Sequence, residues 1–240
     1  HGVTRLLERS RERGVRFPSF TIWHCTTNLT STDPARRALG VKQFAEGAEI
    51  TARLGIPLAA IGSDWPPEWV GSYRAEYDHA PAADFHLPSH HEYENVWQGY
   101  VDAISQCAGI AARYGIRMGL EPRANSLVAS ADAFLRLAGA VQSEPLMCIL
   151  DVMHCAFHRE DAGIAIKKIG PRLALVQMAG TDGETLHHLP LRAGDPVVCS
   201  AVKALREIGF EGPVDVELYG MPAETVDDCY REACAILRAM

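Results

Sequence analysis

The sequence predicts an α/β fold, in which a single (β/α)8 barrel domain spans residues 1–240 and lacks its first one or two βα units. Helical segments alternate with short apolar runs along the chain, which implies a parallel sheet with helices outside it. A glycine separates the helix from the apolar run at most of these junctions. No G-x-G-x-x-G loop, which usually marks a doubly wound sheet, is present.

The helices are predicted from apolar periodicity and from their end signals. Asp33 followed by Pro34 is typical of an N-cap and the first helical position. Glycine at the other end is favoured because it adopts the left-handed conformation without a Cβ penalty. The expected helices are 3–13, 34–54, about 93–114, 130–141, 160–169, 196–208 and about 223–239.

Short apolar runs bounded by turn signals are expected to be buried strands. There are six of them, near residues 17–23, 56–61, 116–120, 147–150, 173–177 and 214–217. A closed barrel needs eight strands, so two are missing from the pattern. The proline-containing segment 63–92 is expected to be an ordered loop over one face.

The composition is that of a globular protein, with 48% hydrophobic and 22% charged residues among 240. The net charge of -7 argues against nucleic acid as a partner, and the chain has no apolar run of the length that a membrane span needs. The seven cysteines are irregularly spaced without a C-x-x-C pair, which is typical of a reduced, cytoplasmic protein. A homodimer is compatible with these observations.

Polar side chains follow the apolar runs where the predicted strands end. Asp151 closes the run 147–150, and His154 follows three residues later. Taken alone, Asp151 is equally well explained as the N-cap of the next helix. Other late strands end in Glu121, Gln177 and Glu217. Because the catalytic groups of a barrel gather at the C-terminal ends of its strands, we expect these four side chains to converge.

Three converging carboxylates would repel one another unless a cation lay among them. Carboxylate and amide oxygens suit Mg²⁺ or Mn²⁺, and Co²⁺ or Zn²⁺ is also compatible. The strand ends therefore predict a site for one divalent metal ion.

The chain resembles the xylose isomerase-like barrels, a group of sugar (phosphate) isomerases and epimerases that includes endonuclease IV. The resemblance covers most of the chain and is clearest at Gly115–Pro122, Leu150–His154, Leu175–Met178 and Leu205–Glu217. It implies that Glu121, Asp151, Gln177 and Glu217 bind the metal and that His154 contacts substrate oxygens. It also implies that about 35–45 residues precede the first helix, since a βαβ unit takes roughly 30 or more.

Gln177 departs from the histidine that is usual in this family. Glutamine is the pattern in hydroxypyruvate isomerase-like and in some dehydroshikimate dehydratase-like members. An amide oxygen is a harder ligand than imidazole, which favours Mg²⁺ or Mn²⁺.

The resemblance implies a metal-dependent isomerase or epimerase that acts on a keto-sugar or a related hydroxy-carbonyl compound. Glu121 and Glu217 would serve as base and acid on opposite sides of the substrate, and the metal would stabilise the enediolate. Further candidates for contact with substrate oxygens are His24, Arg123 and Arg192.

Two alternatives remain open, and a third is argued against by the sequence. A leaving hydroxyl on the neighbouring carbon would make the protein a dehydratase of the dehydroshikimate or keto-inositol type. The barrel could instead be a non-catalytic binding protein. An endonuclease IV-like site needs an Asp-x-His pair after the Gln177 strand, and this pair is absent.

The loop 181–192 is expected to form a lid, with His187 and His188 in solvent rather than as ligands.

Overall fold

The computed structural model describes residues 2–70 and 85–240, with side chains from residue 5 onward. Part of the predicted loop 63–92, residues 71–84, lies outside this range. Within the described ranges, six strands form one parallel sheet in sequence order, which confirms the predicted strand number and orientation. They are β1 Phe20–Thr21, β2 Leu58–Gly62, β3 Arg117–Glu121, β4 Leu146–Asp151, β5 Leu173–Met178 and β6 Val214–Val216.

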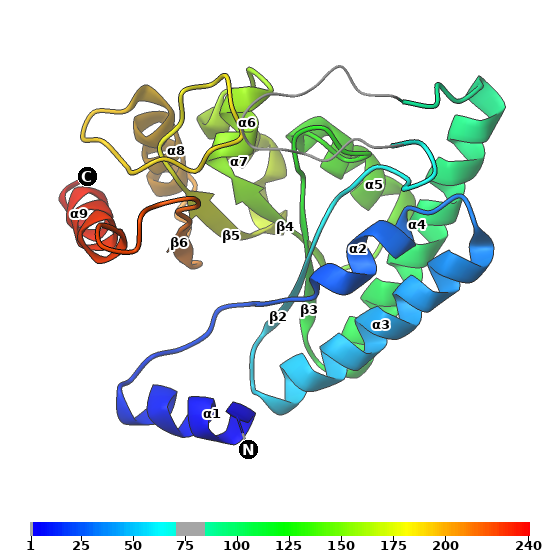
Figure 1. Cartoon of the computed structure of the whole chain (residues 1–240), viewed down its shortest axis with the longest axis horizontal. Coiled ribbons are helices and arrows are strands. Elements are labelled where there is room, and N and C mark those ends of the chain that lie inside the picture. The colour runs from blue at the N-terminus through cyan, green and yellow to red at the C-terminus, as the bar shows by residue number, and fades with distance from the viewer. Residues whose placement is uncertain (1, 71–84) are drawn as a thin grey trace.

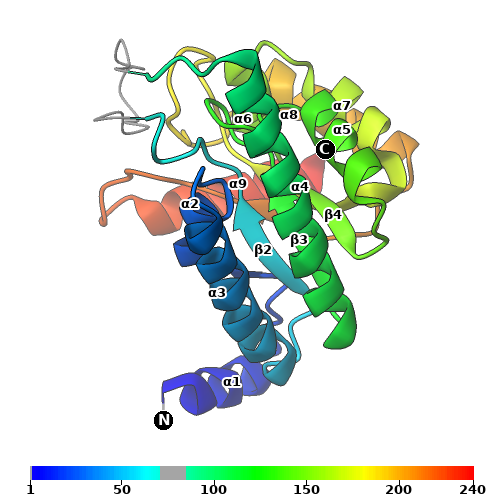
Figure 2. The same ribbon diagram turned by 90° about the vertical axis from the view of Figure 1, so that its right-hand side faces the viewer.

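Nine α-helices are present in the described residues, and most connect consecutive strands. They are α1 Gly2–Glu12, α2 Trp23–Leu29, α3 Pro34–Arg53, α4 His90–Arg113, α5 Ala131–Val141, α6 Val152–Phe157, α7 Ala162–Ile169, α8 Pro196–Glu207 and α9 Val226–Ala239, and a 3₁₀ turn, η1 Gly170–Arg172, precedes β5. The sheet curves as part of a barrel wall with the helices outside it (Figure 1). Helices α3 and α4 lie side by side over β2 and β3 (Figure 2).

The helix ends follow the predicted signals. The side chain of Asp33 accepts a hydrogen bond from the N–H of Ala35, with Pro34 at the first helical position. Gly55, which follows α3, has φ +69°, so its left-handed conformation explains the glycine there. None of the helices in the described residues is long and apolar enough to cross a membrane.

Two short helices, α2 and α6, are absent from the helices that the sequence predicts. Residues 17–23 were expected to be one strand, but only Phe20–Thr21 is strand, and Trp23 already begins α2. Helix α6 begins directly after β4, so His154 lies on a helix. Helices of seven and six residues contain too few turns to show a periodic pattern, so a short apolar run such as residues 20–23 cannot be distinguished from a strand by its sequence.

Two apolar layers pack against the sheet. One lies inside the curved sheet and consists of Leu58, Ala60, Met147, Ile149, Ala174 and Leu175. The other lies between the sheet and its helices, and it includes Ile61, Leu120, Cys148 and Val176. Successive strand residues point to opposite faces, so the residues of the inner layer identify which positions face the barrel interior. The adjacent Ala174 and Leu175 both belong to this layer, at the point where the β4–β5 register shifts. Gly119 leaves room for Ile149 there, since a Cβ at residue 119 would lie 2.7 Å from Ile149 Cδ1.

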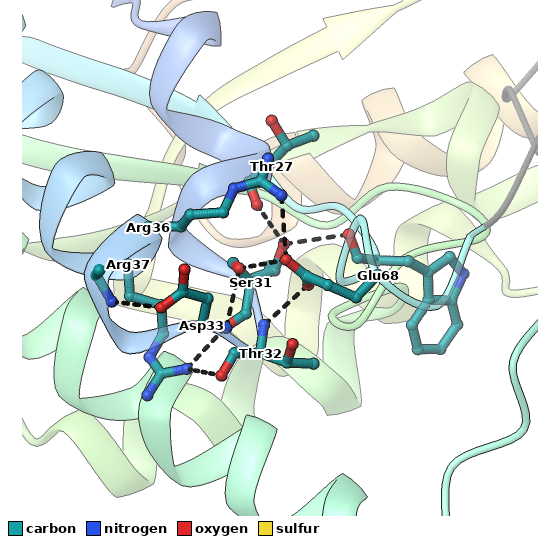
Figure 3. Close-up of polar contacts among 10 residues, drawn as sticks. Thr27, Ser31, Thr32, Asp33, Arg36, Arg37 and Glu68 are labelled. Atoms are coloured by element: carbon teal, nitrogen blue, oxygen red, sulfur yellow. Dashed lines mark hydrogen bonds and ion pairs between the residues drawn. The ribbon is translucent and has the colours of Figure 1, made fainter.

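The loop after β2 is anchored to the start of α3 through Glu68 (Figure 3). The Glu68 carboxylate accepts hydrogen bonds from the hydroxyl of Ser31 at 2.5 Å and from the N–H of Thr32 at 2.9 Å. It also pairs with Arg36 at 3.1 Å. Arg37 donates to the carbonyls of Ser31 and Thr32 at 2.7 and 3.0 Å. These contacts hold the segment that leads away from the C-terminal end of β2.

Candidate active site

The strand geometry directs the four predicted ligands into the barrel interior. Residues two apart on a strand point to the same face. Gly119, Ile149 and Leu175 face inward, so Glu121, Asp151 and Gln177, each two residues further along, face inward as well. Asp151 and Gln177 are direct partners in the β4–β5 register. Glu217 follows β6, and its N–H donates to the carbonyl of Met178 at 3.0 Å. The four side chains therefore reach one mouth from four neighbouring strands.

Asp151 has a partner for each of its two oxygens. Its Oδ1 accepts the N–H of Met153 at 2.8 Å and so caps α6. Its Oδ2 lies 2.8 Å from Nε2 of His188. The two explanations that the sequence left open are therefore not exclusive, because the same buried carboxylate caps a helix and contributes to the site.

His154 is fixed beside two of the carboxylates. The N–H of Ala124 donates to its Nδ1 at 3.3 Å, so this nitrogen is the acceptor and the ring proton lies on Nε2. Nε2 lies 3.4 Å from Glu121 Oε1 and 3.6 Å from Asp151 Oδ2. The imidazole therefore presents its donor to the mouth, where the sequence placed it.

His188 is the residue that the sequence analysis missed. It was expected in solvent, but it is only 5% exposed and bonds to Asp151, whereas its neighbour His187 is half-buried. The loop is closed by paired hydrogen bonds between Gly180 and Leu189, and the N–H of Tyr219 donates to the His188 carbonyl at 3.3 Å. A usable signal was the alternation of Leu186 with His188, because residues two apart in extended chain share a face.

The acidic groups of the mouth perturb one another. Burial, together with the charges of Glu121 and Asp151, raises the pKa of Glu217 to about 7. Burial also favours the neutral form of Asp151, but the electrostatic interaction with His154 and the hydrogen bond with His188 prevail and lower its pKa. Burial opposes protonation of His188, yet its hydrogen bond to Asp151 raises the pKa of the imidazole.

The donor set suits a metal cation. The Nε2 of Gln177 donates to Glu217 Oε2 at 2.5 Å. The other amide atom, Oε1 of Gln177, is buried without a hydrogen-bond partner among the described residues. An unpartnered oxygen among three crowded carboxylates fits a cation better than it fits an empty space. Asp151, His154 and His188 also form a cluster whose possible ligand atoms lie within 4.8 Å of one another.

The other predicted substrate contacts lie farther out. His24 is exposed in the first turn of α2, and Arg123 is half-buried two residues beyond β3. Arg192 is exposed in the loop before α8. No contact to the carboxylates is found for Arg192 or His24 in the part of the chain that the structure describes, so their roles stay predictions.

The chain belongs to the xylose isomerase-like TIM barrel family, whose sequence profile matches residues 1–240. This membership confirms the predicted fold class. No curated protein sequence matches the chain significantly.

Several solved structures share the fold. A 3-keto-D-glucoside 4-epimerase from E. coli is 18% identical with a TM-score of 0.78, over 99% of this chain and 84% of the other. A D-tagatose 3-epimerase-like protein is 17% identical with a TM-score of 0.76, over 99% and 84%. The IOLI protein, solved with a zinc atom, is 16% identical with a TM-score of 0.70, over 99% and 81%. At these identities the likeness establishes the fold alone.

Proposed function

We propose that the protein is a divalent metal-dependent epimerase or isomerase of a keto-sugar or a related hydroxy-carbonyl compound. The observation that carries this proposal is the convergence of Glu121, Asp151, Gln177 and Glu217 at one barrel mouth, with the pKa of Glu217 raised to about 7. The epimerases among the structures with the same fold support it.

Glu121, Asp151, Gln177 and Glu217 are the residues that would hold the metal, and Asp151 is common to this set and to the cluster with the two histidines. The oxygen-rich set favours Mn²⁺ or Mg²⁺, whereas the nearby imidazoles keep Co²⁺ and Zn²⁺ compatible. When bound, the metal would act as a Lewis acid that acidifies the carbon-bound proton next to a carbonyl.

The two glutamates would move the proton. A general base works best when its pKa lies near the operating pH, and the pKa of Glu217 meets this condition. Glu121 ends β3 and Glu217 follows β6, with two strands, β4 and β5, between them in the sheet, so the two carboxylates can address opposite sides of a substrate. If one glutamate removes the proton next to the carbonyl and the other returns it to the same carbon from the opposite side, that carbon is inverted. If the proton is returned to the former carbonyl carbon instead, the carbonyl moves to the neighbouring carbon.

His154 would bind a substrate oxygen. Its Nε2 proton faces the mouth, and the hydrogen bond from Ala124 to Nδ1 prevents the ring from turning away. A donor fixed in this way can stabilise negative charge that develops on the substrate oxygen.

Deuterium exchange tests the proposal. Metal-loaded protein in deuterated water should incorporate solvent deuterium next to the carbonyl of a ketose from a panel that includes D-fructose and D-tagatose. Glu121→Gln and Glu217→Gln should each slow the exchange by at least about a hundredfold, as expected for general acid–base groups. Absence of exchange across keto-sugars and hydroxy acids would favour a binding protein. Loss of water with a new conjugated absorbance would identify a dehydratase.

A further inference from the structure

Arg123 is held at the mouth by an aromatic ring and a glycine. Its guanidinium carbon lies 5.1 Å from the centroid of the Trp23 ring. A Cβ at Gly62, the last residue of β2, would lie 2.8 Å from both Arg123 Cδ and Trp23 Cζ3. The arginine stem and the indole ring therefore pack tightly over the end of β2, and the stack fixes the position of the guanidinium.

The guanidinium of Arg123 donates no hydrogen bond and forms no ion pair within the described residues. The nearby carboxylate is that of Asp64, whose Oδ1 accepts the N–H of Trp65 at 2.9 Å. Burial raises the pKa of Asp64 although the charge of Arg123 acts to lower it, and no hydrogen bond or ion pair joins these two groups.

Other half-buried arginines behave differently. Arg37 donates to the carbonyls of Ser31 and Thr32, and Arg172 donates to those of Ser143 and Leu146. A guanidinium carries five N–H donors, and leaving them without protein acceptors near a buried site is costly. The contrast indicates that the acceptor for Arg123 lies outside the described residues.

We propose that Arg123 recognises an oxyanion group of the substrate, so that the preferred substrates are acidic keto-sugars that carry a carboxylate or a phosphate. This inference rests on the proposed function, because it assigns the substrate class of the same mouth. The planar guanidinium pairs with two oxygens of such a group at once. Because Trp23 and Gly62 already hold the arginine, little side-chain freedom is lost on binding.

The test compares three ketoses that share the same carbonyl: D-fructose, D-fructuronate with a carboxylate at carbon 6, and D-fructose 6-phosphate. Affinities are measured by calorimetry on the metal-loaded protein. At least one acid should bind about tenfold or more tightly than D-fructose. Whichever of the two acids binds more tightly shows whether the site prefers a carboxylate or a phosphate.

Variants then assign the preference to Arg123. Arg123→Gln should reduce the ratio of acid to neutral affinity to about one, and Arg123→Lys should keep part of it, since it retains charge without the planar fork. The matched control is Arg113→Gln, an exposed arginine near the C-terminal end of α4. Thermal unfolding of each variant shows whether it is folded, and the ratio of affinities cancels a general loss of binding.

Equal binding of the three ketoses by the unchanged protein, or a ratio that survives Arg123→Gln, would overturn the inference. The proposed function is judged separately. Deuterium exchange into neutral ketoses with no preference for acids would leave the function standing and remove only the role of Arg123. A preference for acids that depends on Arg123, with no deuterium exchange into any ketose, would leave the role of Arg123 standing and contradict the proposed function.

Discussion

The Nε2 atom of His188 lies 2.8 Å from Oδ2 of Asp151. His188 belongs to the loop 181–192, whose histidines the sequence predicted to be in solvent. Because Met153 donates to the other oxygen of the same carboxylate, Asp151 connects β4, α6 and the loop before α8. A buried carboxylate with both oxygens held has little rotational freedom. Its geometry toward a cation is thus set by the fold before any cation binds.

We expect Asp151→Asn to weaken Mn²⁺ binding by at least about a hundredfold, since it removes a charge that both candidate donor sets share. The measurement is calorimetric titration of chelator-treated protein with Mn²⁺, repeated with Zn²⁺. Asp132→Asn is the matched control, because Asp132 is exposed and pairs with Lys168. Full affinity in both Asp151→Asn and Glu121→Gln would show that the metal site has been assigned wrongly.

His188→Ala should lower metal affinity by about ten- to a hundredfold, the usual effect of losing a group that orients a ligand. It should also cost about 1–3 kcal/mol of unfolding free energy, because an oxygen of the buried Asp151 loses its partner. Titration with Mn²⁺ and urea unfolding measure the two effects. His187→Ala, one residue away and half-buried, should have smaller effects on both. Comparable losses in the two variants would mean that the loop as a whole matters and the Asp151 contact does not.

The metal-free protein should lose stability as pH rises from about 5 to 8. The pKa of Glu217 is raised from 4.5 to about 7, so over this interval the folded state holds a proton that the unfolded state has lost. The raised pKa of His188 acts in the same direction, since its stabilisation is present below the unfolded pKa of 6.5 and is lost as pH passes the folded value. The Glu217 contribution is about 3 kcal/mol at most.

Unfolding free energies from urea titration at several pH values measure this slope. Glu217→Gln should flatten it, and saturating Mn²⁺ should do so in the unchanged protein, because a bound cation favours the ionised carboxylate. A slope that stays the same in Glu217→Gln would contradict the assignment to this residue.

The fold and the placement of the four strand-end side chains were predictable because they follow local rules. Buried strands, glycines after helices and the inward parity of Glu121, Asp151 and Gln177 all appear in short stretches of sequence. Their convergence requires in addition only that parallel strands have their C-terminal ends at the same edge.

What the sequence could not show depends on contacts between distant segments. His188 is turned inward by the Gly180–Leu189 bridge and by the backbone of Tyr219, which lies after the next strand. The stack of Arg123 on Trp23 likewise joins residues 100 positions apart over Gly62. The alternation of Leu186 with His188 indicates a shared face, but no local pattern identifies the distant partner in such a contact. The short helices α2 and α6 were missed because their six or seven residues are too few for a periodic signal.

Glu68→Gln should weaken the attachment of the loop after β2 to α3 and cost about 1 kcal/mol at neutral pH. Burial works against ionisation of Glu68, but the hydrogen bonds from Ser31 and Thr32 prevail and lower its pKa. Its stabilisation is therefore present above the unfolded pKa of 4.5 and is lost as pH falls through the folded value.

Urea unfolding at pH 7 and near pH 3 checks this expectation, since the difference between the Glu68→Gln variant and the unchanged protein should shrink at the acid end. Glu49→Gln is the control, because Glu49 is exposed on α3 and its pairing with Arg53 is long, at 3.7 Å. An equal loss in both variants would assign the effect to surface charge.

Gly180→Ala should have the same effect on the metal site as His188→Ala without altering any polar group. A Cβ at residue 180 would lie 2.3 Å from the carbonyl oxygen of Pro190, a backbone atom that can move only if the loop moves. The Gly180–Leu189 hydrogen bonds would then open, and His188, which precedes Leu189, would shift away from Asp151.

We therefore expect a loss of Mn²⁺ affinity of about ten- to a hundredfold in Gly180→Ala, and little further loss when His188→Ala is added. Calorimetry on the two single variants and the double variant measures this coupling. Gly139→Ala is the matched control, because no atom lies within 4 Å of a Cβ there and alanine suits the interior of α5. Independent, additive losses in the double variant would show that the bridge and the histidine act separately.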